Sequence, residues 1–180
     1  MGGQLRFFGD TFQISKKFDA RRFWRLPVMD GEFLCEDQFG TVKGIGGGNF
    51  LILGQDQSSA LAAAEAAVNA IAGVPNIILP FPGGVVRSGS KVGSRYKQLK
   101  ASTNDAYCPT LKSLVETALP DDVNAVYEIV FDGLDLPSIE QATRVGIQAA
   151  CRPGIRRITA GNYGGNLGPH HIRLHAVLKE

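Results

Sequence analysis

Residues 126–159, VYEIVFDGLDLPSIEQATRVGIQAACRPGIRRIT, decide the fold. An apolar run at 126–131 and another at 155–159 bracket a segment with the spacing of an amphipathic helix. Pro137 suits the first turn of that helix, and Pro153 with the glycine after it ends the helix. The helical face toward the core is expected to carry Ile139, Thr143, Ile147 and Ala150. The stretch therefore predicts a strand, a helix and a second strand.

The same rhythm occurs earlier in the chain. Residues 50–53 predict a buried strand, residues 59–72 an alanine-rich helix, and residues 77–79 another strand. Asp56 and Ser58 can both cap the start of this helix. Its core-facing side is expected to carry Leu61, Ala64, Val68 and Ile71. Two such units predict an α+β fold, a ferredoxin-like split βαβ sandwich with both helices on one face of the sheet.

The remaining segments add strands and irregular chain to this sandwich. Apolar or aromatic runs at 5–8, 23–28 and 33–35, with an Asp-Gly turn between the last two, predict an added N-terminal β-hairpin region. Residues 171–177 alternate in polarity and predict a last strand. The long stretch 85–122 has little periodicity beyond a short helix at 110–119. We expect residues 1–180 to form a single domain.

Composition narrows the class of protein. The chain has 44% hydrophobic and 20% charged residues and a net charge of +2, which is ordinary for a globular protein and too little for a nucleic-acid binder. No run approaches the length of a membrane helix, and the N-terminus has no signal-peptide pattern. Three cysteines without CxxC spacing predict neither a disulfide framework nor a metal site, and favour a cytoplasmic location.

Glu128 is the charged residue inside the apolar run 126–131. Side chains alternate along a strand, so Glu128 shares a face with Val126 and Val130. A carboxylate there loses hydration, which raises its pKa and suits a general acid or base near neutral pH. Alternatively, the strand lies at an edge of the sheet and Glu128 points to water or pairs with an arginine.

Three glycine-rich loops border the predicted strands. They contain Gly47, Gly48 and Asn49, then Gly83 and Gly84, and finally Asn162, Gly164 and Gly165. None opens a helix, so they are not phosphate-binding fingerprints. Each is either a tight turn that needs positive φ or a place where a flat ligand approaches the backbone.

Residues 101–109, ASTNDAYCP, gather polar side chains without strand or helix periodicity. A capped turn and a polar ligand-binding loop both fit this pattern. Cys108 has no histidine nearby in the sequence, which argues against a Cys–His nucleophile. His170, His171 and His175 have no acidic or cysteine ligand close by, so surface histidines are favoured over a metal site.

The chain resembles the C-terminal, or proximal, lobe of formylmethanofuran:tetrahydromethanopterin formyltransferases. The resemblance lies in motifs that occur in order along nearly the whole chain: FFGD, GEFLCEDQFG, GGGNF, AAEAAV, PFPGG, SKVGSRY, ASTNDAYCPT, VYEIV, RVGIQAAC and AGNYGGNLG. It implies transfer of a formyl group between methanofuran and N5 of tetrahydromethanopterin, with these two carriers as co-substrates and no metal or prosthetic group. It also implies a homo-oligomer, typically a tetramer, and in methylotrophs a larger formyltransferase/hydrolase complex.

The resemblance assigns roles to particular residues. The family's proposed catalytic carboxylate lies in its VYEI strand and corresponds to Glu128. Backbone groups of the glycine loops would contact the oxyanion or the pterin, and Lys91 would meet the acidic tails of the coenzymes. The full substrate-binding set is Gly47, Gly48, Asn49, Phe81, Pro82, Gly83, Gly84, Lys91, Ser102, Thr103, Asn104, Asp105, Tyr107, Asn162, Gly164 and Gly165.

Family members carry a preceding lobe that is absent from these residues, so the chain is expected to hold part of a site shared with that lobe and with neighbouring subunits. The alternative function is a non-catalytic, ferredoxin-like ligand-binding or assembly module. In that case the glycine loops are turns and Glu128 is structural.

Overall fold

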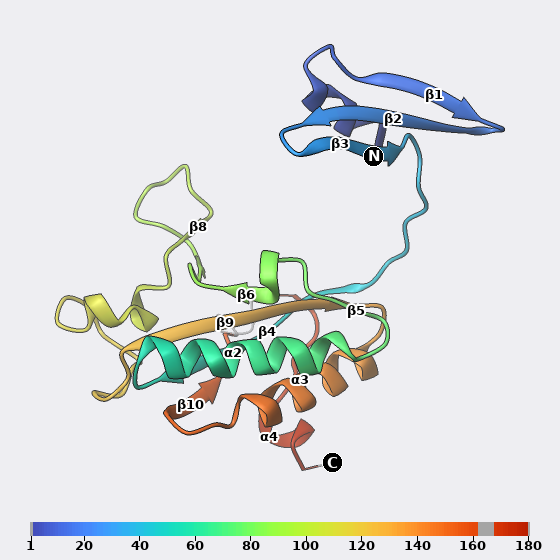
Figure 1. The fold of residues 1–180 in the computed structure, drawn as a ribbon. Coiled ribbons are helices and arrows are strands. Elements are labelled where there is room, and N and C mark those ends of the chain that lie inside the picture. The colour runs from blue at the N-terminus through green and yellow to red at the C-terminus, as the bar shows by residue number, and fades with distance from the viewer. Residues whose placement is uncertain (1, 162–167, 180) are drawn as a thin grey trace. The chain divides into compact units, whose positions relative to one another are not determined.

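The structure, a computed structural model, describes residues 2–161 and 168–179. The chain forms two compact units, Met1–Lys43 and Gly44–Glu180. The second unit contains the elements predicted from the two strand–helix–strand repeats, and it mixes helices and sheet as expected (Figure 1).

The sheet of the second unit is built around β9 (Ala125–Gly133). Its strand order is β10-β4-β9-β5, with β4 at Ile45–Gly54, β5 at Ile77–Ile78 and β10 at Ile155–Thr159. A two-residue strand, β6 (Val85–Val86), also pairs with β9, and every pairing is antiparallel. Strand β9 therefore has neighbours on both edges, which excludes the edge-strand alternative for Glu128. Asp132 and Gly133 belong to this strand.

Two helices cover one face of the sheet. Helix α2 spans Gln57–Ala72, and α3 spans Leu136–Ala150. The side chain of Asp56 accepts the backbone N–H of Ser59 at 2.8 Å, as the sequence predicted. Asp135 caps α3 in the same way through Ser138, at 2.8 Å.

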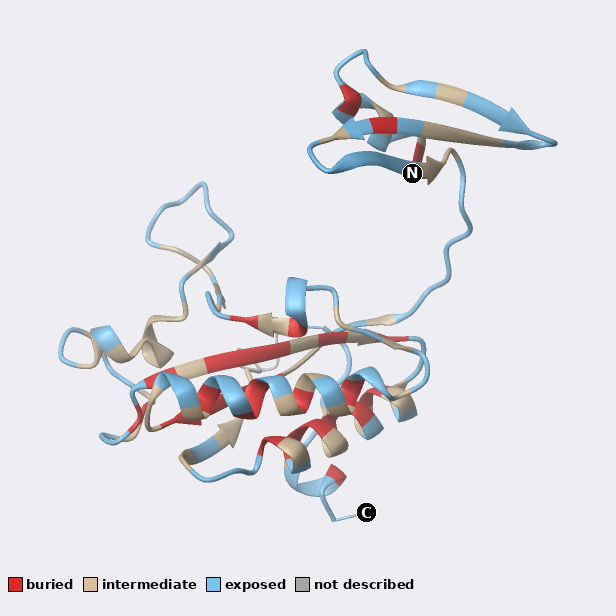
Figure 2. Cartoon of the chain, viewed as in Figure 1, coloured by how far each residue is buried: buried red, intermediate tan, exposed pale blue. Residues whose placement is uncertain are grey.

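The main core lies between these helices and β4 and β9 (Figure 2). Phe50 and Phe131 meet there edge to face, with ring centroids 6.2 Å apart. The predicted face of α3 is confirmed, since all four of its residues are buried. On α2 the prediction is wrong for Leu61, which is exposed. This helix buries small side chains instead, which let it approach its neighbours closely: Ala60, Ala63, Ala64 and Ala67.

A smaller cluster lies on the opposite face of the sheet. It contains Leu51, Leu53, Leu119 and Val123. The chain between β6 and β9 forms short strands β7 (Lys91–Val92) and β8 (Ala101–Ser102) and 3₁₀ turns η3 (Asp105–Tyr107) and η4 (Pro109–Leu111). The helix predicted at 110–119 is wrong beyond η4. Thr117 and Ala118 donate hydrogen bonds back to the carbonyl of Ala106, which replaces helical bonding with a loop closure.

The first unit is a three-stranded antiparallel sheet, β1 (Ile14–Phe18), β2 (Arg21–Val28) and β3 (Gly31–Glu36). The predicted hairpin is β2–β3, in which Val28 pairs with Gly31 across a two-residue turn. The run at 5–8 is not a strand. It belongs to the helical turns α1 (Gly2–Leu5) and η1 (Arg6–Gly9), which end where Asp10 adopts φ 48°.

The last predicted strand, 171–177, is also wrong. Its second half is a short helix, α4 (Leu174–Val177), that packs beside α3. Val177 is buried, and its carbonyl accepts a hydrogen bond from Nε of Arg144 on α3 at 2.8 Å. An alternating pattern this short also fits one helical turn, in which Leu174 and Val177 lie on the same side.

We expect Gly146→Ala to lower the free energy of unfolding by about 1–3 kcal/mol, because the helices touch at this position. An added Cβ would lie 2.7 Å from Cδ1 of Ile71 and 3.0 Å from Cζ of Phe50. Helix propensity alone predicts the opposite sign, a gain of about 1 kcal/mol. Gly73→Ala is the matched control, since its Cβ would meet only a carbonyl oxygen at 3.6 Å. Urea unfolding of both variants measures the difference, and a stabilised Gly146→Ala would contradict the close packing.

Candidate active site

Glu128 lies in the middle of β9 on the face away from the two helices. Its register partners are Leu51 on β4 and Val86 on β6, whose side chains share its face because directly opposed residues point the same way. The glutamate is therefore flanked by an apolar residue on each side, and only 7% of it is exposed. The predicted alternation of the strand is confirmed, since Tyr127, Ile129 and Phe131 face the helical core.

The electrostatic environment of Glu128 favours the protonated acid. Burial raises the pKa of this carboxyl above its ordinary value of 4.5, and a hydrogen bond from Asn49 opposes the shift. Nδ2 of Asn49 donates to Oε1 of Glu128 at 3.2 Å. Among the residues described, this amide and not an arginine is the partner of Glu128, and Oε2 accepts no hydrogen bond from them.

Glu128 lines a cavity of about 450 Å³ on this face of the sheet. The volume is in the range of small-molecule sites. The polar side chains of its wall supply amides, hydroxyls, a thiol and a guanidinium: Gln57, Arg87, Ser88, Asn104, Tyr107, Cys108, Thr110 and Asn124. We call this space the Glu128 cavity. It brings together three predicted site residues, Glu128, Asn104 and Tyr107.

The predicted polar loop reaches the cavity through only part of its length. Lys91 on β7 forms an ion pair with Asp105, with 2.5 Å between Nζ and Oδ1, and this holds the pKa of Asp105 below its ordinary value. Ser102 donates to the carbonyl of Gly93 at 2.8 Å, and Thr103 lies 3.5 Å from the sulfur of Cys108. These contacts fold the β7–β8 hairpin and η3, which in turn present Asn104 and Tyr107 to the cavity.

The first glycine loop is required by the backbone geometry of β4. Gly47 adopts φ 79° in an irregularity of the pairing between Ile45 and Gly48. A Cβ on Gly48 would lie 2.8 Å from the ring of Phe131. Gly47, Gly48 and Asn49 also line a second cavity of about 260 Å³, together with His170, His171 and Arg173. Because Asn49 bonds to Glu128, the walls of the two cavities are joined by one hydrogen bond.

The remaining predicted substrate contacts lie either outside the Glu128 cavity or outside the residues that the structure describes. Phe81, Pro82, Gly83 and Gly84 precede β6 and lie outside the Glu128 cavity as the described residues define it. Gly84 adopts φ 72°, and a Cβ there would lie 2.8 Å from Val68, so packing accounts for it. Asn162, Gly164 and Gly165 lie outside the residues that the structure describes.

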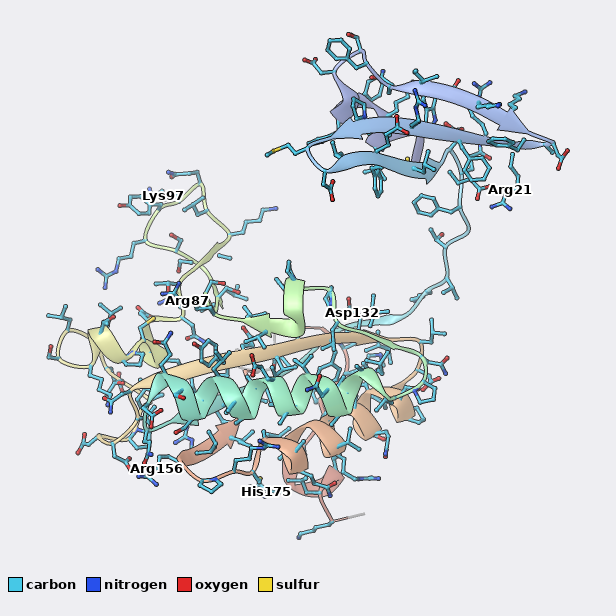
Figure 3. All side chains as sticks on the ribbon, viewed as in Figure 1. Arg21, Arg87, Lys97, Asp132, Arg156 and His175 are labelled. Carbon is cyan, nitrogen blue, oxygen red and sulfur yellow. The ribbon has the colours of Figure 1, made fainter. Side chains whose placement is uncertain are left out.

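A larger cavity, of about 1030 Å³, lies near β10 and α4. Its walls carry Arg152, Arg156, Arg157, Arg173, His175 and Lys179 and, among the described residues, no carboxylate. Arg156 pairs with Asp122 across 2.5 Å, and Figure 3 shows Arg156 and His175 along the lower side of the second unit in this view. The proton donor or acceptor on its wall, His175, is exposed, whereas Glu128 is buried in the smaller cavity, so this cavity is the weaker candidate.

Further polar residues line the Glu128 cavity although no pattern in the sequence selects them: Gln57, Arg87, Ser88, Thr110 and Asn124. Gln57 opens α2 and also donates to the hydroxyl of Tyr127 at 3.4 Å. Arg87 directly follows the apolar pair Val85–Val86, but two residues are too few to predict a strand, so the pairing of β6 with β9 is what places Arg87 beside the cavity. Within the part of the chain described, no cluster of His, Cys, Asp or Glu could hold a metal ion.

Comparison with known proteins identifies the family. A sequence model described as FTR, proximal lobe, matches residues 31–177. The chain belongs to the FTR family. This confirms the resemblance read from the motifs, and the matched region spans the end of the first unit and nearly all of the second.

FTR relatives extend the match over almost the whole chain. The chain is 59% identical to the formylmethanofuran--tetrahydromethanopterin formyltransferase of Methylobacillus flagellatus, covering 99% of this chain and 60% of the relative. It is 54% identical to the enzyme of the same name from Methanothermobacter thermautotrophicus, covering 97% and 60%. The chain thus spans about three fifths of the length of these FTR proteins.

Solved FTR structures share the fold. The formyltransferase of Methanosarcina barkeri is 49% identical with a TM-score of 0.75, over 98% of this chain and 60% of that one. A chain of the formyltransferase/hydrolase complex from Methylorubrum extorquens, solved with methylofuran, is 50% identical with a TM-score of 0.73, over 99% and 61%.

We expect Glu128→Gln to change how stability depends on pH. The folded-state pKa of Glu128 lies above the ordinary 4.5, so the protonated acid stabilises the fold below pH 4.5 and this contribution is lost as pH rises toward the raised value. Glutamine does not titrate. The unfolding free energy of the variant relative to wild type should therefore increase with pH over this window, by at most about 1.4 kcal/mol per pH unit, and then level off.

Asp135→Asn is the control with the opposite sign. Hydrogen bonds from Ser138 lower the pKa of Asp135 below the ordinary 3.8, so its contribution is complete above that pH and lost below it. Its difference from wild type should stay flat above pH 4.5, where that of Glu128→Gln changes. Denaturant titrations across this range measure both curves. A flat curve for Glu128→Gln would show that the carboxyl is hydrated in the folded protein.

Proposed function

We propose that this chain is the proximal lobe of an enzyme that transfers a formyl group between formylmethanofuran and N5 of tetrahydromethanopterin. The observation that supports it is Glu128, a carboxyl buried in a small-molecule cavity with its pKa raised. A structural glutamate would gain more from an ion pair or from water than from a site between Leu51 and Val86. Relatives at up to 59% identity carry this activity in their names.

The proposed chemistry exchanges one formyl group for one proton. N5 of the pterin attacks the formyl carbon, a C–N bond forms, and the carbonyl oxygen becomes an oxyanion. Collapse of this tetrahedral intermediate breaks the bond to the methanofuran nitrogen, which leaves as an amine. The proton lost from N5 must reach that leaving nitrogen, and a carboxyl with a raised pKa can accept and donate it.

The two carboxyl oxygens of Glu128 have different surroundings, which suits this role. Oε1 is oriented by Nδ2 of Asn49 at 3.2 Å, while Oε2 remains available to the cavity. Neutral donors for the developing oxyanion are present in the same wall, where Asn104, Tyr107 and Asn124 supply amide N–H and phenol O–H groups. Neither carrier needs a metal or prosthetic group for this sequence of steps.

The finer description of the fold belongs to the same proposal. We propose one domain of ferredoxin-like split βαβ type with an added N-terminal β region. The strand order β10-β4-β9-β5, with α2 between β4 and β5 and α3 between β9 and β10, supports that class. The family match across residues 31–177 supports treating both compact units as parts of one lobe.

We further propose that activity requires the rest of the enzyme. The chain covers about 60% of its relatives, so a second lobe and neighbouring subunits would complete the site. One relative, from Methylorubrum extorquens, is named as a subunit of a formyltransferase/hydrolase complex, which supports a homo-oligomeric or larger assembly here as well.

Three free thiols support a reducing, cytoplasmic location. In the described chain no helix is long and apolar enough to cross a membrane.

A chimera tests the function directly. This chain replaces the aligned segment of the Methylobacillus flagellatus relative, to which it is 59% identical. We expect conversion of formylmethanofuran and tetrahydromethanopterin to the formylated pterin, followed by absorbance. The control chimera carries the corresponding segment of the Methylococcus capsulatus relative, a protein of the same name, at the same junctions. It shows whether the enzyme tolerates these junctions. Activity in that control without activity in the test chimera would favour a non-catalytic module.

In the active chimera, Glu128→Gln should lower kcat by about 10²–10⁴-fold, because the amide cannot exchange the proton. Glu65→Gln is the matched control, since it removes an exposed carboxylate from α2 by the same substitution. Initial rates and circular dichroism of both variants separate lost chemistry from lost folding. Full activity of a folded Glu128→Gln enzyme would exclude the acid–base role.

A further inference from the structure

The Glu128 cavity contains two charged side chains among the residues that define it, Glu128 and Arg87. They have different surroundings. Glu128 is buried, whereas Arg87 is exposed. A cavity with a buried acid and an accessible cation is asymmetric, so a ligand with an anionic group has a preferred orientation in it.

Strand pairing places Arg87 close to Glu128 without bringing their charges together. Val86 is the register partner of Glu128, and Arg87 is the next residue, where β6 ends. Figure 3 shows Arg87 toward the start of β9, at the end away from Asp132. No ion pair or hydrogen bond joins the guanidinium to the carboxyl among the described residues. Both groups line the same cavity of about 450 Å³, so one ligand can contact both.

Arg87 also differs from several other arginines in having no partner. Arg21 pairs with Glu36, Arg25 with Glu32 and Arg156 with Asp122. Arg87 makes no ion pair or hydrogen bond to any residue that the structure describes. A guanidinium has five N–H donors in a planar fork that matches carboxylate and phosphate oxygens, so an unpaired one beside a cavity is well suited to bind an anion.

Lys91, which the family resemblance assigned to the acidic tails of the coenzymes, already forms an ion pair. Lys91 lies 2.5 Å from Asp105, and this pair stabilises the hairpin that presents Asn104 and Tyr107. Asp105 already compensates the charge of Lys91, so Lys91 attracts a further anion less than an unpaired cation does. Arg87 can bind an anion without breaking any contact within the described chain.

We infer that Arg87 is an anion subsite of the Glu128 cavity, which holds a carboxylate or phosphate on the tail of one of the two carriers. The inference rests on the proposed formyl transfer and adds how a substrate is oriented. The anionic tail lies at the exposed mouth beside Arg87, and the reacting end lies toward Glu128. The apolar wall between them, which includes Leu51, Val86 and Val126, suits the uncharged part of the carrier.

The test is Arg87→Ala in the chimera, with KM measured separately for each carrier. We expect KM for one carrier to rise about ten- to a hundred-fold, as for loss of one charge-assisted hydrogen-bonded contact, with kcat changed by about two-fold or less. The carrier affected shows whether the furan or the pterin tail supplies the anion. Removing the acidic group of that carrier should give wild type and Arg87→Ala the same KM. Arg87→Lys should recover part of the loss.

Arg95→Ala is the matched control, because Arg95 is exposed in the neighbouring hairpin region and does not line the cavity as described. An unchanged KM for both carriers in Arg87→Ala would overturn the inference. A fall in kcat with constant KM would also overturn it, since Arg87 would then act on the reacting atoms. A chimera without turnover would contradict the proposed function but would not test the anion subsite. Calorimetric affinities of both carriers for wild type and Arg87→Ala then decide the subsite.

Discussion

The second unit depends on the fixed register of β9, the strand at the centre of its sheet. β9 is paired on both edges and presents Ile129 and Phe131 to the helical core, so its register is fixed by that core. Once the register is fixed, Glu128 must face the other way, between Leu51 and Val86. Burying an ionised carboxylate without a cation costs several kcal/mol, and protonation relieves this cost. A strand needed for stability thus sets the proton affinity of the candidate catalytic group.

The glycine-rich segment before β4 serves this arrangement. Gly48 lies against Phe131 without room for a Cβ, and Gly47 takes the positive φ that the irregular pairing requires. Regular pairing then resumes at Gly48 opposite Phe131, and it places Asn49 opposite Val130, on the same face as Glu128 and two residues away across the strands. Loops that look like ligand contacts in the sequence therefore act first by bringing an amide to the carboxyl. Contact with substrate, where it occurs, is added to that role.

Local signals were sufficient for much of the fold. The caps, the helical spacing and the alternation around Glu128 are encoded within short windows, so the strands β4, β9 and β10 and both long helices were predictable. Residues 171–177 were not, because seven residues fit either period and packing against α3 decides between them. Arg87 was not predicted as a site residue. Its place beside Glu128 depends on tertiary pairing between β6 and β9, which lie about forty residues apart in the sequence.

The same dependence explains why chemistry and recognition occupy different parts of the cavity. An acid–base group must be dehydrated to work near neutral pH, and β9 supplies such a place. A cation that selects an anionic tail must instead remain accessible, and the end of β6 supplies that. If Lys91 rather than Arg87 carried the recognition, binding would compete with the Asp105 pair and with the hairpin that shapes the wall. An unpaired arginine avoids this competition, so substrate binding and the integrity of the cavity do not oppose each other.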